Sequence, residues 1–209
     1  MYTPTPFAEA DLARLADIVR ANSFGLLVTN GEPAPTASHL PFLLDFDVGT
    51  GQGRLLCHVA RANPHWRGIA TAGVALAVFS GPHGYVSPRW YRTAPAVPTW
   101  NYVAVHVEGP ARAIHDPAAL RAIVARLADR HEAGAPDAWS IEALPSDFFD
   151  RQQKAIVGIE IAVERISGKR KLSQNRPAAD RAGVVAALES DGDPLARDLA
   201  AEMRARELE

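Results

Sequence analysis

Short apolar runs separated by turn-forming residues most constrain how this chain can fold. Ser23–Thr29 and Pro35–Asp45 flank the dipeptide Asn30-Gly31, and the glycine-rich stretch Gly49–Gly53 precedes a third run, Arg54–Val59. Asn-Gly between two such runs is typical of a β-hairpin, because both residues tolerate positive φ. Repeated strands with tight connections predict an antiparallel β-barrel rather than alternating strands and helices.

The rest of the chain adds strands and peripheral helices, for about six or seven strands in total. Further strands are expected at Val74–Phe79, Trp100–Ile114 and Ala155–Ile166. Helices are expected at Ala8–Ala21, Pro64–Ile69, Asp116–His131, Ser146–Gln153, Ala179–Leu188 and Pro194–Arg206. Glycines and prolines interrupt the pattern in Ser80–Thr99, which is expected to be a long irregular loop of the kind that carries function.

Composition places the protein in the cytoplasm. The single cysteine, Cys57, cannot form an internal disulfide. The N-terminus lacks the basic and apolar regions of a signal peptide, and no apolar run approaches the roughly 20 residues that span a bilayer. We therefore expect no membrane partner.

Polar side chains gather in the turn after the run Arg54–Val59, where His58, Arg61, Asn63 and His65 lie close together. A guanidinium matches phosphate geometry, and the start of the helix that follows offers free N–H groups to an anion. The turn therefore predicts a phosphate site. The alternative is that Asn63 only caps the helix and that Arg61 and His65 are exposed.

Four amphipathic rings, Tyr85, Trp90, Tyr91 and Trp100, fall within sixteen positions. Such rings stack on an aromatic ligand or pack across a subunit interface, and a plain core cluster is the alternative. The seven histidines show no HxH or HExxH spacing, so no metal site is predicted. Neither a G-x-S-x-G elbow nor a G-x-G-x-x-G loop occurs, so no catalytic residue and no dinucleotide fingerprint is predicted.

Charge is uneven along the chain, whose formal net charge is −2. The basic stretch Lys169, Arg170, Lys171 and Arg176 stands between Gly168 and Pro177 and is expected to be a strand-end loop. It can meet DNA, a phosphate ligand or an acidic partner, or it can simply be solvated. DNA is therefore a possible partner, but the sequence shows no recognition helix that would support DNA binding.

Several long motifs, in this order, resemble the PaiB family, also called the FMN-binding negative transcriptional regulators. They are HLPFLL at His39–Leu44, HVARANPHW at His58–Trp66, FSGPHGYVSPRWY at Phe79–Tyr91, VPTWNYVAVHVEG at Val97–Gly109 and GKRKLSQNR at Gly168–Arg176. The resemblance runs from residue 1 to about residue 190. It implies an FMN-binding split barrel related to pyridoxine-phosphate oxidase, as a homodimer with FMN at its interface. Residues 1–176 would form this domain, with C-terminal helices 177–209 packed on it.

Carried onto this chain, the resemblance assigns cofactor-binding residues in three groups. The strand Thr36–Leu40, which carries Ser38 and His39, would lie beside the isoalloxazine. The phosphate turn would comprise His58, Arg61, Asn63, His65 and Trp66. Either Trp100 and Asn101, or Lys171 and Gln174, would reach the partner subunit's flavin.

The family's regulatory label implies a repressor for which flavin is a structural or sensing ligand, but such a label does not transfer on fold alone. The alternative is an FMN-dependent, flavin-reductase-like oxidoreductase, so whether the protein is an enzyme stays open. A weaker alternative is a haem-binding split barrel.

Overall fold

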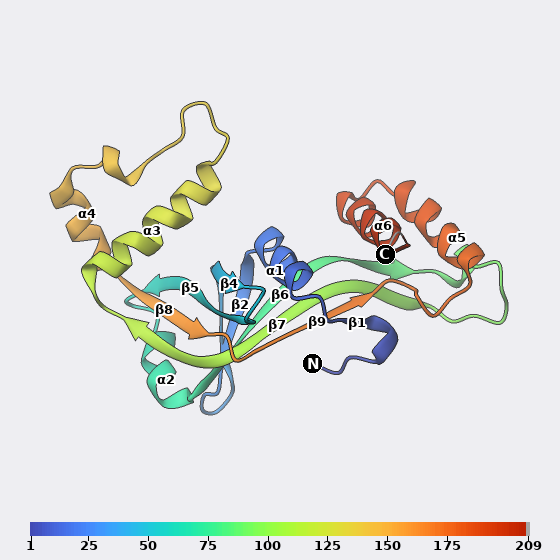
Figure 1. The fold of residues 1–209 in the computed structure, drawn as a ribbon, viewed down its shortest axis with the longest axis horizontal. Helices are drawn as coiled ribbons and strands as arrows, with labels where there is room; N and C mark the ends of the chain where they lie inside the picture. Colours follow the sequence, from blue (N-terminus) through green and yellow to red (C-terminus); the bar gives the residue numbers. More distant parts are fainter. Residues whose placement is uncertain (208–209) are drawn as a thin grey trace. The chain divides into compact units, whose positions relative to one another are not determined.

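The computed structural model describes residues 1–207, except for the side chains of Ala70, Ser146 and Glu207 (Figure 1). Its contacts divide the chain into two compact units. The unit that we call the barrel unit comprises Val19–Phe79 and His106–Ile166. The other, the helix-pair unit, comprises Met1–Ile18, Ser80–Val105 and Ser167–Glu209. The domain boundary expected after residue 176 stays a prediction.

Antiparallel strands dominate the fold, as predicted. Seven strands form the main hydrogen-bonded path of the sheet. They are β2 (Phe24–Thr29), β3 (Thr36–Pro41), β4 (Leu43–Asp47), β5 (Gln52–Ala60), β6 (Val74–Val86), β7 (Thr99–Ile114) and β8 (Ile156–Ala162). They are hydrogen-bonded in the order β3-β2-β6-β7-β8-β5-β4. Two short strands, β1 (Ala8–Glu9) and β9 (Arg165–Lys171), complete a nine-stranded sheet, in which β9 pairs with β1 and β7.

The helices of the barrel unit are α2 (His65–Ala72), α3 (Pro117–Glu132) and α4 (Ser146–Gln153), with a 3-10 turn at Ile141–Ala143. Asp116 begins α3 as predicted, since its carboxylate accepts the Ala119 N–H at 2.8 Å. The buried face of α3, with Ile123 and Leu127, packs on Leu43 and Leu56. This packing covers one side of β4 and β5. The helix α2 follows the C-terminal end of β5.

The helix-pair unit takes its name from α5 (Ala178–Glu189) and α6 (Pro194–Glu207), which lie side by side (Figure 1). Its other elements are α1 (Leu12–Ala21), which continues into the barrel unit, and the 3-10 turns η1 (Thr5–Phe7) and η2 (Pro88–Trp90). A side chain at Gly84 of β6 would meet Leu199 at 3.1 Å. The helix pair therefore packs closely on β6. No helix within residues 1–207 combines the length and the apolar character that crossing a bilayer requires.

Three expected elements have different bounds in the structure. The helix expected at Ala8–Ala21 begins only at Leu12, because the Asp11 carboxylate accepts the Ala13 N–H at 2.9 Å and so caps it. The run Pro35–Asp45 forms two strands, because β3 pairs with β2 whereas β4, which follows Phe42, pairs with β5. The run Ala155–Ile166 is likewise divided between β8 and β9.

The prediction of an irregular loop over Ser80–Thr99 was wrong in its first part, because β6 continues to Val86. The expected strand-end loop at Lys169–Arg176 was also wrong in its first part, since Lys169 and Arg170 lie buried in β9, whereas residues 172–176 form the loop that follows this strand. The β2–β3 hairpin is present as predicted. However, neither Asn30 nor Gly31 is among the positive-φ residues of the described chain, so the turn is not of the type that the dipeptide favours.

Candidate functional site

A buried histidine links three segments of the barrel unit. His65, at the start of α2, is 2% exposed. Its Nε2 lies 3.0 Å from the Thr29 hydroxyl at the end of β2, and its Nδ1 lies 2.9 Å from the Ser38 hydroxyl on β3. Burial lowers the pKa of His65. The ring is therefore neutral at physiological pH, with one nitrogen donating and the other accepting.

Asn63 completes this network from the turn before α2. Its side-chain amide donates to the Ser38 hydroxyl at 3.2 Å, and its Oδ1 accepts the His65 N–H at 3.0 Å. Asn63 therefore does cap the helix, as the alternative interpretation of the sequence proposed, and it also fixes Ser38. His65, however, is buried rather than exposed.

A cavity of about 460 Å³ opens beside this network. Its polar lining comprises Thr29, Asn30, Glu32, Thr36, His65 and Thr71. The volume falls within the range of roughly 300–1,000 Å³ typical of small-molecule sites. Hydroxyl and amide groups beside a helix start suit a phosphate ester and the polar edge of a flavin. Thr29, Asn30 and Thr71 were not predicted from the sequence, whereas Thr36 lies in the strand that the resemblance places beside the isoalloxazine.

The structure places Arg61 differently from the sequence expectation. Its Nε donates to the Lys154 carbonyl at 2.6 Å and its Nη2 to the Ile156 carbonyl at 2.8 Å. The Trp66 indole N–H in turn donates to the Arg61 carbonyl at 2.9 Å. Arg61 and Trp66 therefore join the turn to the start of β8, and neither lines the cavity. A role for Arg61 as the phosphate ligand stays a prediction that this arrangement does not favour.

The two remaining expected residues of the barrel unit lie apart from this network. His39 is exposed on β3 and stacks on Phe24, with ring centroids 6.2 Å apart. Burial lowers the pKa of His58, and its Nδ1 is buried with no hydrogen-bond partner among the described residues. An unpaired buried nitrogen of this kind is available to a bound molecule or a water.

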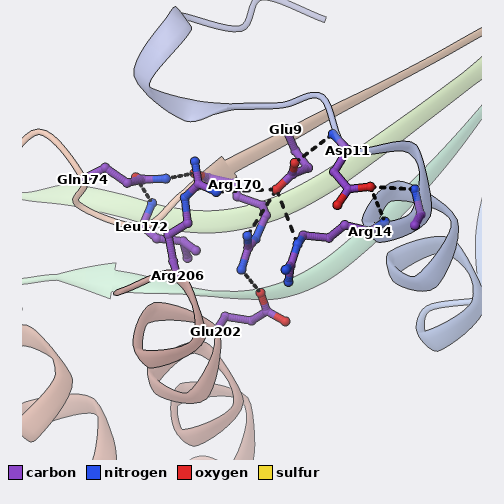
Figure 2. A network of polar contacts seen from close by, with 9 residues as sticks. Glu9, Asp11, Arg14, Arg170, Leu172, Gln174, Glu202 and Arg206 are labelled. Atoms are coloured by element: carbon purple, nitrogen blue, oxygen red, sulfur yellow. Dashed lines mark hydrogen bonds and ion pairs between the residues drawn. The ribbon is translucent and has the colours of Figure 1, made fainter. Parts of the chain in front are cut away.

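The other expected residues meet in the helix-pair unit. The Lys171 ammonium donates to the Thr99 hydroxyl at 2.6 Å and to the Trp100 carbonyl at 2.5 Å. The buried Asn101 amide donates to the Ser173 hydroxyl at 2.9 Å. Gln174 instead holds its own turn by bonds to the backbone of Leu172 and Arg170, as Figure 2 shows.

A small cavity of about 120 Å³ lies among these residues, with Lys171 and Arg176 in its lining. The Arg176 guanidinium lies 4.5 Å from the centre of the buried Tyr91 ring. The Tyr91 hydroxyl and the Asn101 Oδ1 have no hydrogen-bond partner within residues 1–207. Burial, with Lys169 nearby, lowers the pKa of Lys171. This lining suits a small anionic group. That it serves the same flavin as the His65 network stays a prediction.

Within the described part of the chain, no three metal-ligating side chains gather into a group that could hold an ion.

The buried histidines predict a pH dependence of stability. His58 and His65 have folded pKa values below the ordinary value, so the unfolded chain takes up protons first as the pH falls below about 6.5. Their contribution is fully present above that pH and is lost as the pH falls through the folded pKa values. We expect the urea midpoint to be lower at pH 5.5 than at pH 7.5. Equal midpoints at the two pH values would contradict this assignment.

Comparison with known proteins agrees with the sequence resemblance. Residues 1–165 match the family model described as "Putative FMN-binding domain". The chain is 34% identical over 200 residues to "Protease synthase and sporulation protein PAI 2" of Bacillus subtilis, covering 96% of this chain and 95% of that protein. It is 31% identical over 244 residues to an uncharacterized protein of Emericella nidulans, covering 99% and 97%.

Solved structures share the fold at low sequence identity. The flavocytochrome Anf3 of Azotobacter vinelandii superposes with a TM-score of 0.64 at 16% identity, covering 84% of this chain and 75% of that one. The FAD and heme binding protein of Mycobacterium smegmatis superposes with a TM-score of 0.62 at 18% identity, covering 84% of this chain and 78% of that one. These likenesses support the split-barrel fold.

Proposed function

Because this chain belongs to the PaiB family of FMN-binding proteins and its cofactor is FMN, we propose that it is a flavin-dependent regulator rather than a catalyst. FMN would be its structural or sensing ligand. The B. subtilis relative is named for protease synthesis and sporulation, which suits control of gene expression. A cytoplasmic location is part of this proposal.

The observation that carries the proposal is the buried His65 under the cavity of the barrel unit. Its two ring nitrogens bridge the Thr29 and Ser38 hydroxyls, so the ring is held in one orientation. A preorganised set of neutral donors and acceptors binds a ligand at low entropic cost. Within this proposal, His65 and Asn63 position the Ser38 hydroxyl for the cofactor's polar groups, and the start of α2 faces its phosphate.

FMN is expected to bind at least ~10-fold more tightly than riboflavin, since a hydrogen bond to a charged group contributes roughly 1.5–3 kcal/mol. Riboflavin lacks the phosphate and would lose that contact. Flavin fluorescence quenching measures both dissociation constants on the same apoprotein. Equal constants would show that the phosphate has no site here.

Absorbance of the purified protein before and after addition of FMN separates the candidate functions. A flavin spectrum without NAD(P)H turnover supports the regulator. Turnover of NAD(P)H in the presence of FMN would support an FMN-dependent oxidoreductase, and a Soret band would support haem binding. This single preparation therefore tests the proposal against both alternatives.

A homodimer is also part of the proposal, since the split-barrel flavoproteins that this chain resembles hold FMN between two subunits. Trp90 and Trp100 remain candidate interface rings, whereas Tyr91 is buried within its own chain. Sedimentation at micromolar concentration tests the dimer directly, and a monomer mass would contradict it.

The basic stretch is expected to serve flavin or the partner subunit rather than DNA. Lys169 is 7% exposed and Arg170 is 2% exposed, so neither can reach a phosphate backbone. Any DNA binding should be weak, indifferent to sequence and strongly salt-dependent. Titration of promoter and scrambled DNA at two salt concentrations checks this. Sequence-specific nanomolar binding at about 150 mM salt, lost in Lys171→Ala/Arg176→Ala with flavin and dimer intact, would favour a direct repressor.

A further inference from the structure

A second large cavity, of about 380 Å³, lies in the helix-pair unit and differs in chemistry from the cavity beside His65. One wall is aromatic and comes from β6, η2 and the start of β7. The other wall comes from the turn between α5 and α6. The residues that matter are His83, Tyr85, Trp90, Trp100, Asp191 and Asp193.

Three rings form a corner on the aromatic wall. The Tyr85 ring centroid lies 6.4 Å from that of Trp90, with the planes at 71°, and 6.4 Å from that of Trp100, with the planes at 62°. Tyr85 is 47% exposed and Trp100 is 48% exposed, so part of each ring stays open to a ligand, and the His83 ring covers part of Trp100 with the centroids 5.8 Å apart and the planes at 32°. Rings in crossed planes around one cavity present several π-faces to the same ligand.

The opposite wall carries two carboxylates in fixed positions. The Asp191 Oδ1 accepts the Asp193 N–H at 2.9 Å, and the Asp193 Oδ1 accepts the Leu195 N–H at 2.9 Å. The second oxygen of each carboxylate has no partner among residues 1–207. The described lining contains neither lysine nor arginine, so the cavity carries net negative charge.

We propose that this cavity binds a methylated ammonium cation, of the kind carried by a trimethylammonium headgroup. An organic cation over the face of Trp or Tyr is attracted by the ring quadrupole, and clustered rings recognise quaternary ammonium groups in this way. The open carboxylate oxygens add a longer-range attraction. The three rings favour a bulky cation, because its N-methyl groups contact ring faces without needing hydrogen-bond acceptors from them.

The same chemistry separates this site from the flavin site. Asp191 and Asp193 would repel the FMN phosphate, and no cation in the described lining compensates for them. The two open carboxylates therefore disfavour a phosphate ester here more than the single Glu32 carboxylate does in the cavity beside His65, where a helix start also faces the ligand. The proposal does not depend on the function proposed for the barrel unit.

The test is calorimetric titration of the FMN-loaded full chain with choline chloride and with 3,3-dimethylbutan-1-ol, its neutral isostere. Choline is expected to bind at least ~10-fold more tightly than the alcohol. Trp100→Ala should weaken choline binding by about 10-fold or more. Asp191→Asn/Asp193→Asn, which keeps the backbone-accepting oxygens, should weaken it several-fold and leave flavin binding unchanged.

Trp139→Ala is the matched control, because Trp139 is 44% exposed and lies outside this cavity. It should leave choline binding as in the wild type. Equal affinity for choline and its isostere, or no choline binding, would overturn the proposal. A dimeric wild type whose subunit association is unaffected by choline, together with a monomeric Trp100→Ala variant, would also overturn the proposal. The rings would then belong to a subunit interface.

Discussion

Arg170→Met is expected to lower the free energy of unfolding by about 3–5 kcal/mol, the usual cost of breaking a buried ion pair from one side. Arg170 is 2% exposed, and its guanidinium contacts two carboxylates that come from opposite ends of the chain. Nη1 lies 3.2 Å from Glu9, and Nη2 lies 3.2 Å from Glu202 (Figure 2).

The size of this effect follows from what the substitution leaves behind. The Glu9 side chain is only 7% exposed, so without Arg170 a carboxylate stays buried beside more distant cations. Arg14 and Arg206 lie 3.9 Å and 3.8 Å from the same carboxylate. The free energy of unfolding of Arg170→Lys should lie between those of the wild type and Arg170→Met, because one ammonium replaces a planar guanidinium that contacts both carboxylates.

Arg14→Met is the matched control. Arg14 faces the same carboxylate, but its side chain is 37% exposed, and partly exposed pairs contribute only about 0–1 kcal/mol. Adding Glu9→Gln to Arg170→Met should recover part of the loss, because it removes a buried carboxylate that has lost its nearest cation. Urea unfolding of the wild type and the four variants measures these differences. If Arg170→Met unfolded at the same urea concentration as Arg14→Met, the ion pair would not stabilise this unit.

Local sequence signals predicted the elements whose ends are decided locally. Asp116 caps α3 through its own side chain, and α4 matches its predicted bounds of Ser146–Gln153. The continuation of β6 past Ser80 was missed because Gly81 and Pro82 read as turn residues. In the structure, the small residue Gly84 lets the helix pair pack against the strand, and that requirement comes from α6, over a hundred residues away in sequence.

The candidate site shows the same division between local and distant partners. The turn before α2 and Asn63 as its cap follow from neighbouring residues. The commitment of Arg61 to the carbonyls of Lys154 and Ile156 does not, because these partners stand more than ninety residues away. The burial of Arg170 likewise depends on Glu9 and Glu202. Charge counts along a sequence cannot separate a solvated basic stretch from a buried one.

Gly183→Ala is expected to destabilise the protein by about 1–3 kcal/mol, although alanine is the better helix former by about 1 kcal/mol. Gly183 lies in the middle of α5, where an added Cβ would stand 2.1 Å from the Trp90 carbonyl oxygen. That oxygen belongs to the backbone of η2, so either the helix or the turn must move. Because Trp90 lines the cavity of the helix-pair unit, the substitution should also weaken choline binding there.

Gly68→Ala provides the matched comparison in α2, because a Cβ at Gly68 would have no neighbour within 4 Å. There the same substitution should raise the free energy of unfolding by up to about 1 kcal/mol through helix propensity alone. Urea unfolding of both apoproteins, without FMN because Gly68 lines the cavity beside His65, measures the opposite signs. A stabilising Gly183→Ala with unchanged choline binding would show that α5 does not rest on η2, and that Trp90 takes its position from something else.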